Sequence, residues 1–191
     1  PNEDFLEYNT AEADCQSRAG LSAYCPLELG RSVMAMRAFH YRDGQLYCDQ
    51  VPLARVAQEV GTPLHVYSRC DLEARLQALE DGFGETPHLI CYALKANSNL
   101  HLLHILAQKG CGADVVSGGE LILARRAQVP PERIVFAGVG KTDAEIEQAL
   151  QEDILALNVE SLAELEIVHG IACKLGKRAR VALRVNPDID A

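Results

Sequence analysis

Lys95 is the residue of this 191-residue chain whose setting most favours chemistry. It lies in the stretch Cys91–Asn97 (CYALKAN). The apolar run from His88 to Ala93 stands between Pro87 and the polar residues 97–99, which predicts a buried strand that ends in a turn. A lysine that is partly desolvated at the end of a strand has a lowered pKa, and its neutral amine can attack an aldehyde to form a Schiff base. The alternative is an ordinary solvated lysine, which is the commoner case.

A carboxylate interrupts a later apolar segment. Asp114 lies in Gly110–Leu121 (GCGADVVSGGEL), among small and branched apolar residues. A buried carboxylate is costly unless it is paired, so in a barrel Asp114 is expected inside, within reach of Lys95. The alternative is that Asp114 caps a helix or a turn. Ser117 with Glu120 fits a helix cap, so Ser117 is given only a minor role in the site.

An arginine alternates with apolar residues near the end of the chain. Arg184 stands between Leu183 and Val185 in the segment Arg180–Pro187 (RVALRVNP). Inside a barrel its guanidinium is expected to point toward the site, because parallel strands are usually covered on both faces. The alternative is that Arg184 faces solvent at an edge of the sheet.

A Gly-Lys-Thr sequence suggests nucleotide binding, but its spacing does not fit. In Phe136–Thr142 (FAGVGKT) the first glycine of a P-loop would fall at Val135, which argues against a kinase or an ATPase. His101 and His104 lie three residues apart in a leucine-rich segment that has no further ligands of a metal site. No metal is therefore expected.

Short apolar strands alternate with amphipathic helices from residue 64 onward. Strands are predicted at Leu64–Tyr67, His88–Ala93, Ala113–Val116, Ile134–Ala137, Ile154–Val159 and Arg180–Val185. Helices are predicted between them, at Asp71–Leu79, Leu100–Gln108, Gly118–Ala127, Asp143–Leu150 and Leu162–Lys174. Three of these helices begin with the pattern of a capping box: Ser117 with Glu120, Thr142 with Glu145, and Ser161 with Glu164.

This alternation predicts an α/β fold in which helices join parallel strands. A flavodoxin-like open sheet and a (β/α)8 TIM-type barrel share the pattern. A barrel needs eight strands, so the chain is expected to hold only the N-terminal part of one. Such an unclosed part exposes strand edges and apolar helix faces, and is expected to be unstable or associated when isolated.

Three regions are distinguished along the chain. Residues 1–33 have no clear helical or strand period and are expected to be an extension of uncertain origin. Residues 34–58 are expected to form a hairpin with an Asp43-Gly44 turn and the start of a helix over Pro52–Val60. Residues 59–191 are assigned to the incomplete barrel.

Composition limits the possible partners. The net charge of −9 argues against nucleic acid. Hydrophobic residues make up 48% of the chain, and no apolar run approaches the roughly 20 residues that span a bilayer, so no membrane partner is expected. The seven cysteines include no C-x-x-C pair, which fits a reducing cytoplasm.

Several of these segments resemble one enzyme family. Tyr92–Asn97 (YALKAN) resembles the signature of pyridoxal-phosphate enzymes with the alanine racemase-like barrel, the fold type III decarboxylases and their relatives, whose lysine holds the cofactor. Among them, the diaminopimelate decarboxylase family is the most similar. The other segments that carry this resemblance are Gly61–Pro63, Gly110–Leu121, Phe136–Lys141, Ala156–Leu165 and Arg180–Pro187. The resemblance runs from about Phe39 to Ala191.

The resemblance implies a carboxy-lyase of lysine biosynthesis, which removes CO2 from meso-2,6-diaminopimelate to give L-lysine with pyridoxal 5′-phosphate as cofactor. Lys95 would be the catalytic Schiff-base residue, Asp114 and Arg184 would bind the cofactor, and Lys141 would lie near the barrel mouth. The full-length protein would be a homodimer with an amino-acid substrate. The remaining site residues and a C-terminal β domain, with which the N-terminal segment would pair, would lie beyond Ala191. Residues 1–191 alone are therefore expected to be inactive.

Two alternatives to this function stay open. A related decarboxylase that acts on ornithine or arginine has a similar lysine motif but differs around Asp114–Glu120. A non-catalytic relative would bind pyridoxal phosphate without turning over a substrate.

Overall fold

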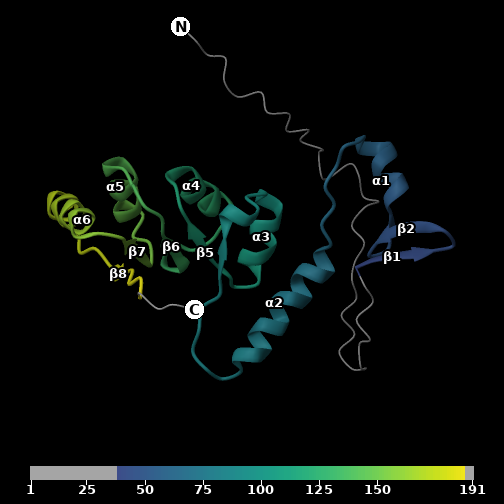
Figure 1. Cartoon of the computed structure of the whole chain (residues 1–191), viewed down its shortest axis with the longest axis horizontal. Helices are drawn as coiled ribbons and strands as arrows, with labels where there is room; N and C mark the ends of the chain where they lie inside the picture. The colour runs from purple at the N-terminus through teal and green to yellow at the C-terminus, as the bar shows by residue number, and fades with distance from the viewer. Residues whose placement is uncertain (1–37, 188–191) are drawn as a thin grey trace, which may run out of the picture. The chain divides into compact units, whose positions relative to one another are not determined.

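The computed structural model describes residues 38–187, which divide into two compact units between Gly84 and Glu85 (Figure 1). The extension predicted at 1–33 lies outside the described residues. The boundary expected between residues 58 and 59 stays a prediction. Within the described part, no helix combines the length and the apolar character needed to cross a membrane.

The first unit contains a small antiparallel sheet and two helices. Its elements are β1 (Phe39–Arg42), β2 (Gln45–Cys48), β3 (Val51–Pro52), α1 (Leu53–Val60) and α2 (Arg69–Phe83). The predicted hairpin is confirmed. Asp43 and Gly44 form its turn with φ values of 51° and 75°, and a two-residue hairpin loop favours such left-handed conformations. The helix expected after the hairpin is confirmed as α1.

The strand predicted at Leu64–Tyr67 is wrong. This segment is irregular, and no described strand pairs with it. An apolar segment becomes a strand only where a neighbour supplies hydrogen bonds and packing, so its local composition could not decide the matter. Helix α2 follows at Arg69, because the Ser68 hydroxyl accepts a hydrogen bond from Asp71 N at 2.9 Å and caps the helix. Helix α2 is longer at both ends than the helix predicted at Asp71–Leu79.

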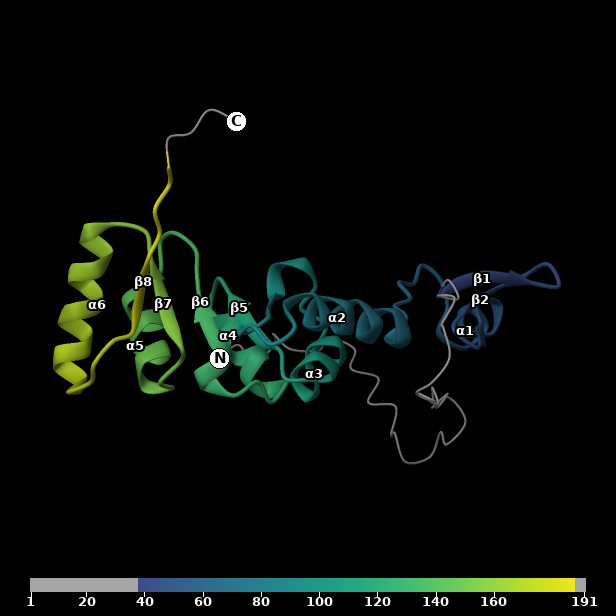
Figure 2. The ribbon, with the colours of Figure 1, turned by 90° about the horizontal axis from the view of Figure 1, so that it is seen from below.

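The second unit is a parallel sheet with its helices along one side (Figures 1 and 2). Its strands are β4 (Cys91–Ala93), β5 (Gly112–Val115), β6 (Ile134–Phe136), β7 (Ala156–Val159) and β8 (Val181–Leu183). The helices between them are α3 (Leu100–Gln108), α4 (Gly118–Arg126), α5 (Asp143–Gln151) and α6 (Leu162–Leu175). The predicted α/β alternation is confirmed, with five strands in the sheet instead of six. The strands neighbour one another in chain order, without the reversal of a doubly wound sheet, which favours a barrel.

Alternation along the strands separates an apolar face of this sheet from a more polar one. The strand residues that pack with the helices in the apolar core are Tyr92, Ala113, Val115, Ile134, Phe136 and Leu157. The strand residues between them form the opposite face, here called the open face: Cys91, Ala93, Gly112, Asp114, Val135, Ala156, Asn158 and Ala182. Helix packing therefore decides which side chains are left for a site.

Three helices begin as predicted, at hydroxyl residues followed by glutamates. The side chains of Ser117, Thr142 and Ser161 each accept a hydrogen bond from the backbone N–H three residues later. Thr142 with Glu145 forms the complete capping box. In the other two helices, the glutamate accepts a hydrogen bond from the N–H of the residue before the cap. All three glutamates thus fix the turn between a strand and its helix.

Glu145 joins the starts of two neighbouring helices. Its Oε2 accepts a hydrogen bond from Thr142 N at 2.9 Å, at the start of α5. Its Oε1 accepts another from Gly118 N at 2.7 Å, at the start of α4. These backbone hydrogen bonds hold the pKa of Glu145 below its usual value, because they favour the ionised carboxylate.

Replacing Glu145 by glutamine should therefore destabilise the protein in a pH-dependent way. At pH 7 we expect the free energy of unfolding to fall by about 1 kcal/mol, as for the loss of a helix cap. Because the folded pKa is the lower one, the contribution of the carboxylate is present above the ordinary glutamate pKa of about 4.3 and is lost as the pH falls through the folded pKa. Urea denaturation at pH 7 and in acid measures the difference. Glu147→Gln, an exposed neighbour on α5, is the control, and an equal loss at both pH values would contradict the prediction.

Candidate functional site

Lys95 lies in a 3₁₀ turn, Leu94–Ala96, directly after β4. Leu94 is 1% exposed and anchors this turn in the apolar core, whereas Lys95 is exposed. The strand predicted over His88–Ala93 is shorter in the structure, where it begins at Cys91. The turn therefore places Lys95 at the carboxyl end of the sheet, where parallel α/β folds bind their ligands.

Asp114 lies within β5, on the open face. It is paired in register with Ala93 of β4, two residues before Lys95. Its Oδ1 atom is buried and has no hydrogen-bond partner among the described residues. Burial raises the pKa of Asp114, and the positive charge of Lys95 partly opposes this rise. The alternative that Asp114 caps a helix is wrong, because α4 is capped by Ser117 instead.

Arg184 directly follows β8 and continues the open face. Ala182, two residues earlier, is paired in register with Asn158 of that face. The Arg184 side chain is 55% exposed, and its Nη1 donates a hydrogen bond to Glu160 Oε1 at 3.2 Å. Arg184 is thus an exposed residue that is held by a carboxylate.

Lys95 and Asp114 come from neighbouring strands, but Arg184 is separated from them by β6 and β7. In the described part of the chain, no hydrogen bond or ion pair joins Arg184 to either residue. The three residues share one face and one end of the sheet. Their roles in a site remain predictions.

Glu160 and Asn158 are residues of this region to which the sequence analysis gave no role. They line a hollow of about 290 Å³ at the carboxyl end of the open face. Its lining residues are Ala137, Asn158, Glu160, Ala182, Leu183 and Arg184. The available signal was the position of Glu160 directly after a strand and before the Ser161 cap.

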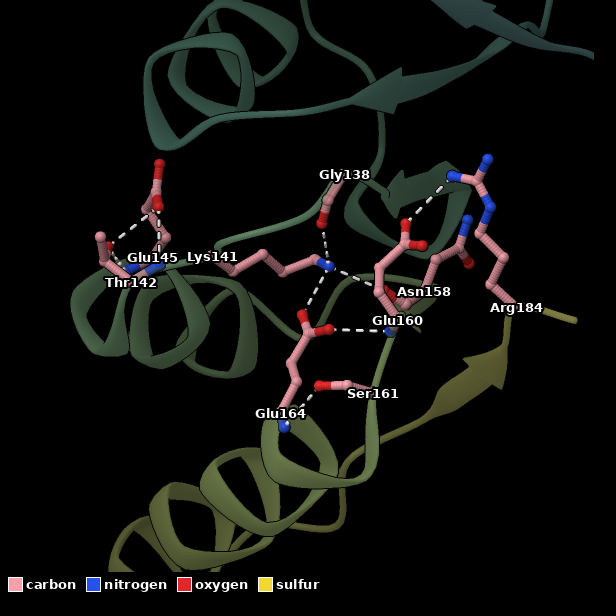
Figure 3. Close-up of polar contacts among 9 residues, drawn as sticks. All are labelled: Gly138, Lys141, Thr142, Glu145, Asn158, Glu160, Ser161, Glu164 and Arg184. Atoms are coloured by element: carbon pink, nitrogen blue, oxygen red, sulfur yellow. Dashed lines mark hydrogen bonds and ion pairs between the residues drawn. The ribbon is translucent and has the colours of Figure 1, made fainter. Parts of the chain in front are cut away.

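Lys141 lies in the loop after β6, but its amine is turned into the protein. The side chain is 1% exposed, and Nζ donates to Glu164 Oε1 and to the carbonyl oxygens of Gly138 and Asn158 at 2.7 to 2.8 Å (Figure 3). A lysine ammonium has three donors, and all three are used here. Lys141 therefore cannot serve a phosphate as a P-loop lysine does.

The open face suits a flat, anionic cofactor that carries an aldehyde. The strand residues Ala93, Ala156 and Ala182 have small side chains on this face. Lys95 can supply an amine at the carboxyl end, and Asp114 Oδ1 is a buried acceptor still without a donor. Buried polar atoms are nearly always paired in folded proteins, so an unpaired one favours a bound group that supplies the missing donor.

Comparison with known proteins identifies the class. Residues 57–191 match the family described as pyridoxal-dependent decarboxylase, pyridoxal binding domain. The chain belongs to this family. The predicted resemblance to pyridoxal-phosphate decarboxylases, and the predicted cofactor, are thereby confirmed.

Individual proteins of known name are also similar to this chain. A diaminopimelate decarboxylase of Aquifex aeolicus is 54% identical over 150 residues, which cover 78% of this chain and 35% of the relative. One of Vibrio cholerae is 52% identical over 157 residues, 82% of this chain and 38% of the relative. The crystal structure of diaminopimelate decarboxylase from M. jannaschii in co-complex with L-lysine has a TM-score of 0.75 and 39% identity, and the match covers 80% of this chain and 36% of that one. The chain thus spans little more than a third of the length of these relatives.

The unpaired carboxylate gives a stability prediction. Because burial raises the folded pKa of Asp114, its favourable contribution is complete below the unfolded pKa of about 3.9 and is lost as the pH rises through the folded pKa. Without cofactor, Asp114→Asn should therefore raise the free energy of unfolding at neutral pH, by at most about 1 kcal/mol for this partly buried side chain, and should give no gain in acid. Urea denaturation at both pH values measures this, with the exposed Asp81→Asn as control. A loss of stability at neutral pH would contradict the prediction.

Proposed function

We propose that this chain is the N-terminal part of a pyridoxal-phosphate-dependent decarboxylase that converts meso-2,6-diaminopimelate into L-lysine and CO2. The observation that carries the proposal is the position of Lys95 at the carboxyl end of β4, next to the strand that bears Asp114, whose buried Oδ1 is unpaired. The choice of substrate is supported by identities of 54% and 52% to diaminopimelate decarboxylases.

The five parallel strands would be the first part of a (β/α)8 barrel. Their order along the sheet follows the chain, and the helices cover one face, as in such a barrel. The open face would then line the barrel interior. This explains why it bears small residues and a carboxylate where the other face bears large apolar side chains.

Three residues of this chain would hold the cofactor. Lys95 would bind it covalently, with Asp114 and Arg184 beside it. When bound, pyridoxal phosphate supplies an aldehyde for the lysine and a conjugated ring that takes up the electron pair left by the departing carbon dioxide. The Lys95 amine, once released by the substrate amine, can carry a proton at Nζ to the carbon that has lost its carboxylate. Asp114 can accept a hydrogen bond through Oδ1, and Arg184 can donate hydrogen bonds to an anionic oxygen.

The oligomeric state and the cellular compartment of the whole enzyme are also proposals. We expect a homodimer in the cytoplasm that acts on a free amino acid. Support for a reducing compartment comes from Cys48, Cys91 and Cys173, which are free thiols. Burial raises the pKa of the Cys48 and Cys91 thiols, which makes both less reactive toward oxidants.

Covalent retention of pyridoxal phosphate tests the role of Lys95. The amine condenses with the aldehyde and releases water, and borohydride then adds hydride across the C=N bond to give a stable secondary amine. Intact mass should show the adduct in the full-length protein, and peptide mapping should place it on Lys95. Lys95→Ala should lose it completely, whereas Lys174→Ala, an exposed lysine on α6, should keep it. An adduct that still forms in the Lys95→Ala variant would contradict the role of Lys95.

Substrate choice is tested separately in the full-length protein. We expect release of CO2 from meso-2,6-diaminopimelate with formation of L-lysine, and turnover of ornithine and arginine at least 100-fold lower in kcat/KM, a ratio that a site built for a second polar group can reach. Carbon dioxide release on each amino acid measures it. Turnover of ornithine or arginine without turnover of diaminopimelate would support the related decarboxylase, and cofactor binding without any turnover would support a non-catalytic protein.

A further inference from the structure

Glu160 connects Arg184 to the carboxyl end of β7. The Glu160 side chain is 11% exposed, whereas that of Arg184 is 55% exposed. Packing fixes the carboxylate, and the carboxylate in turn restrains a long side chain that would otherwise sample many rotamers. Glu160 therefore restrains the guanidinium through Nη1, while Arg184 Nε donates a second hydrogen bond to Asn186 Oδ1 at 3.3 Å.

The backbone of Glu160 is fixed by a buried ion pair. Glu164 Oε2 accepts a hydrogen bond from Glu160 N at 2.8 Å, while its Oε1 accepts one from Lys141 Nζ at 2.7 Å. Lys141 also binds the carbonyl oxygens of Gly138 and Asn158. One buried amine thus ties together the loop after β6, the end of β7 and the first turn of α6. Figure 3 shows this series of contacts running from Lys141 to Arg184.

We propose that Glu160 is a positioning residue for Arg184 in the decarboxylation, and that the Lys141–Glu164 pair holds Glu160 in place. The inference rests on the proposed function, in which Arg184 donates hydrogen bonds to an anionic oxygen of the cofactor or of the substrate. Such a donor is effective only when it is held where the charge is, because a displacement of about 1 Å can cost a hundredfold in rate. Glu160 is within hydrogen-bond distance of Arg184, and it lines the same hollow.

The test uses Glu160→Gln and Glu160→Ala in the full-length holoenzyme. We expect kcat to fall by roughly 10-fold in the first and 100-fold in the second, since the amide keeps one acceptor and alanine keeps none. The dissociation constant of pyridoxal phosphate, measured by equilibrium dialysis, should rise in the same order. The matched control is Glu152→Gln. Glu152 Oε2 pairs with Arg125 Nε at 2.9 Å at the end of α5, away from the open face, and this variant should change neither quantity.

A double-mutant cycle separates positioning from a general effect on the fold. In an Arg184→Gln background, Glu160→Gln should have no further effect on kcat or on cofactor affinity, because the residue that it positions is gone. Equal losses in both backgrounds, or a Glu160→Gln variant that behaves like Glu152→Gln, would overturn the positioning role. In those outcomes the Lys95 adduct still forms, so the proposed function stands. Absence of the adduct in the unaltered protein would overturn both.

Discussion

The packing of α3 to α6 on one face of the parallel sheet is the interaction on which the candidate site depends. Phe136, Leu121, Ile146 and Val168 are among the largest fully buried side chains, and burying each stabilises the fold by about 1.5–3 kcal/mol. Side chains alternate along a strand, so a slip of one residue would turn Asp114 under the helices and Ala113 or Val115 away from them. The apolar core thereby fixes the register that leaves a carboxylate on the open face.

The elements that could be predicted from the sequence are those with local causes. The hydroxyl caps at Ser117, Thr142 and Ser161 and the Asp43-Gly44 turn each need only a few neighbouring residues, and all are present. The strand predicted at Leu64–Tyr67 had a suitable composition, but a strand also needs a partner, and no described strand pairs with it. The end of β4 was predicted correctly, but its first residue was not. Asn97 to Asn99 mark a turn locally, whereas the first paired residue depends on β5.

The candidate site was less predictable because its contacts join residues distant in the sequence. Glu160 and Arg184 are 24 residues apart, and Lys141 and Glu164 are 23 apart. No local pattern shows that these partners meet, so Glu160 received no role from the sequence. The neighbouring relation of Lys95 and Asp114 could be anticipated, because consecutive parallel strands bring their carboxyl ends to the same edge of the sheet.

Lys95 and Lys141, the two lysines singled out by the sequence analysis, differ in their hydrogen-bond partners. Lys141 belongs to a Gly-Lys-Thr sequence like that of a nucleotide-binding loop. Its side chain is nevertheless 1% exposed, and its three donors are used by Gly138, Asn158 and Glu164. Such a group stabilises one conformation of three segments and has no donor left for a ligand. Lys95 is exposed at the end of β4, beside the buried and unpaired Oδ1 of Asp114. A buried acceptor without a donor costs free energy in the cofactor-free protein, and this cost is recovered when a bound group supplies the donor. The polar groups of Lys141 and Glu164, which the fold satisfies, thus hold three segments together, whereas Asp114 Oδ1 keeps an acceptor that a bound group could use.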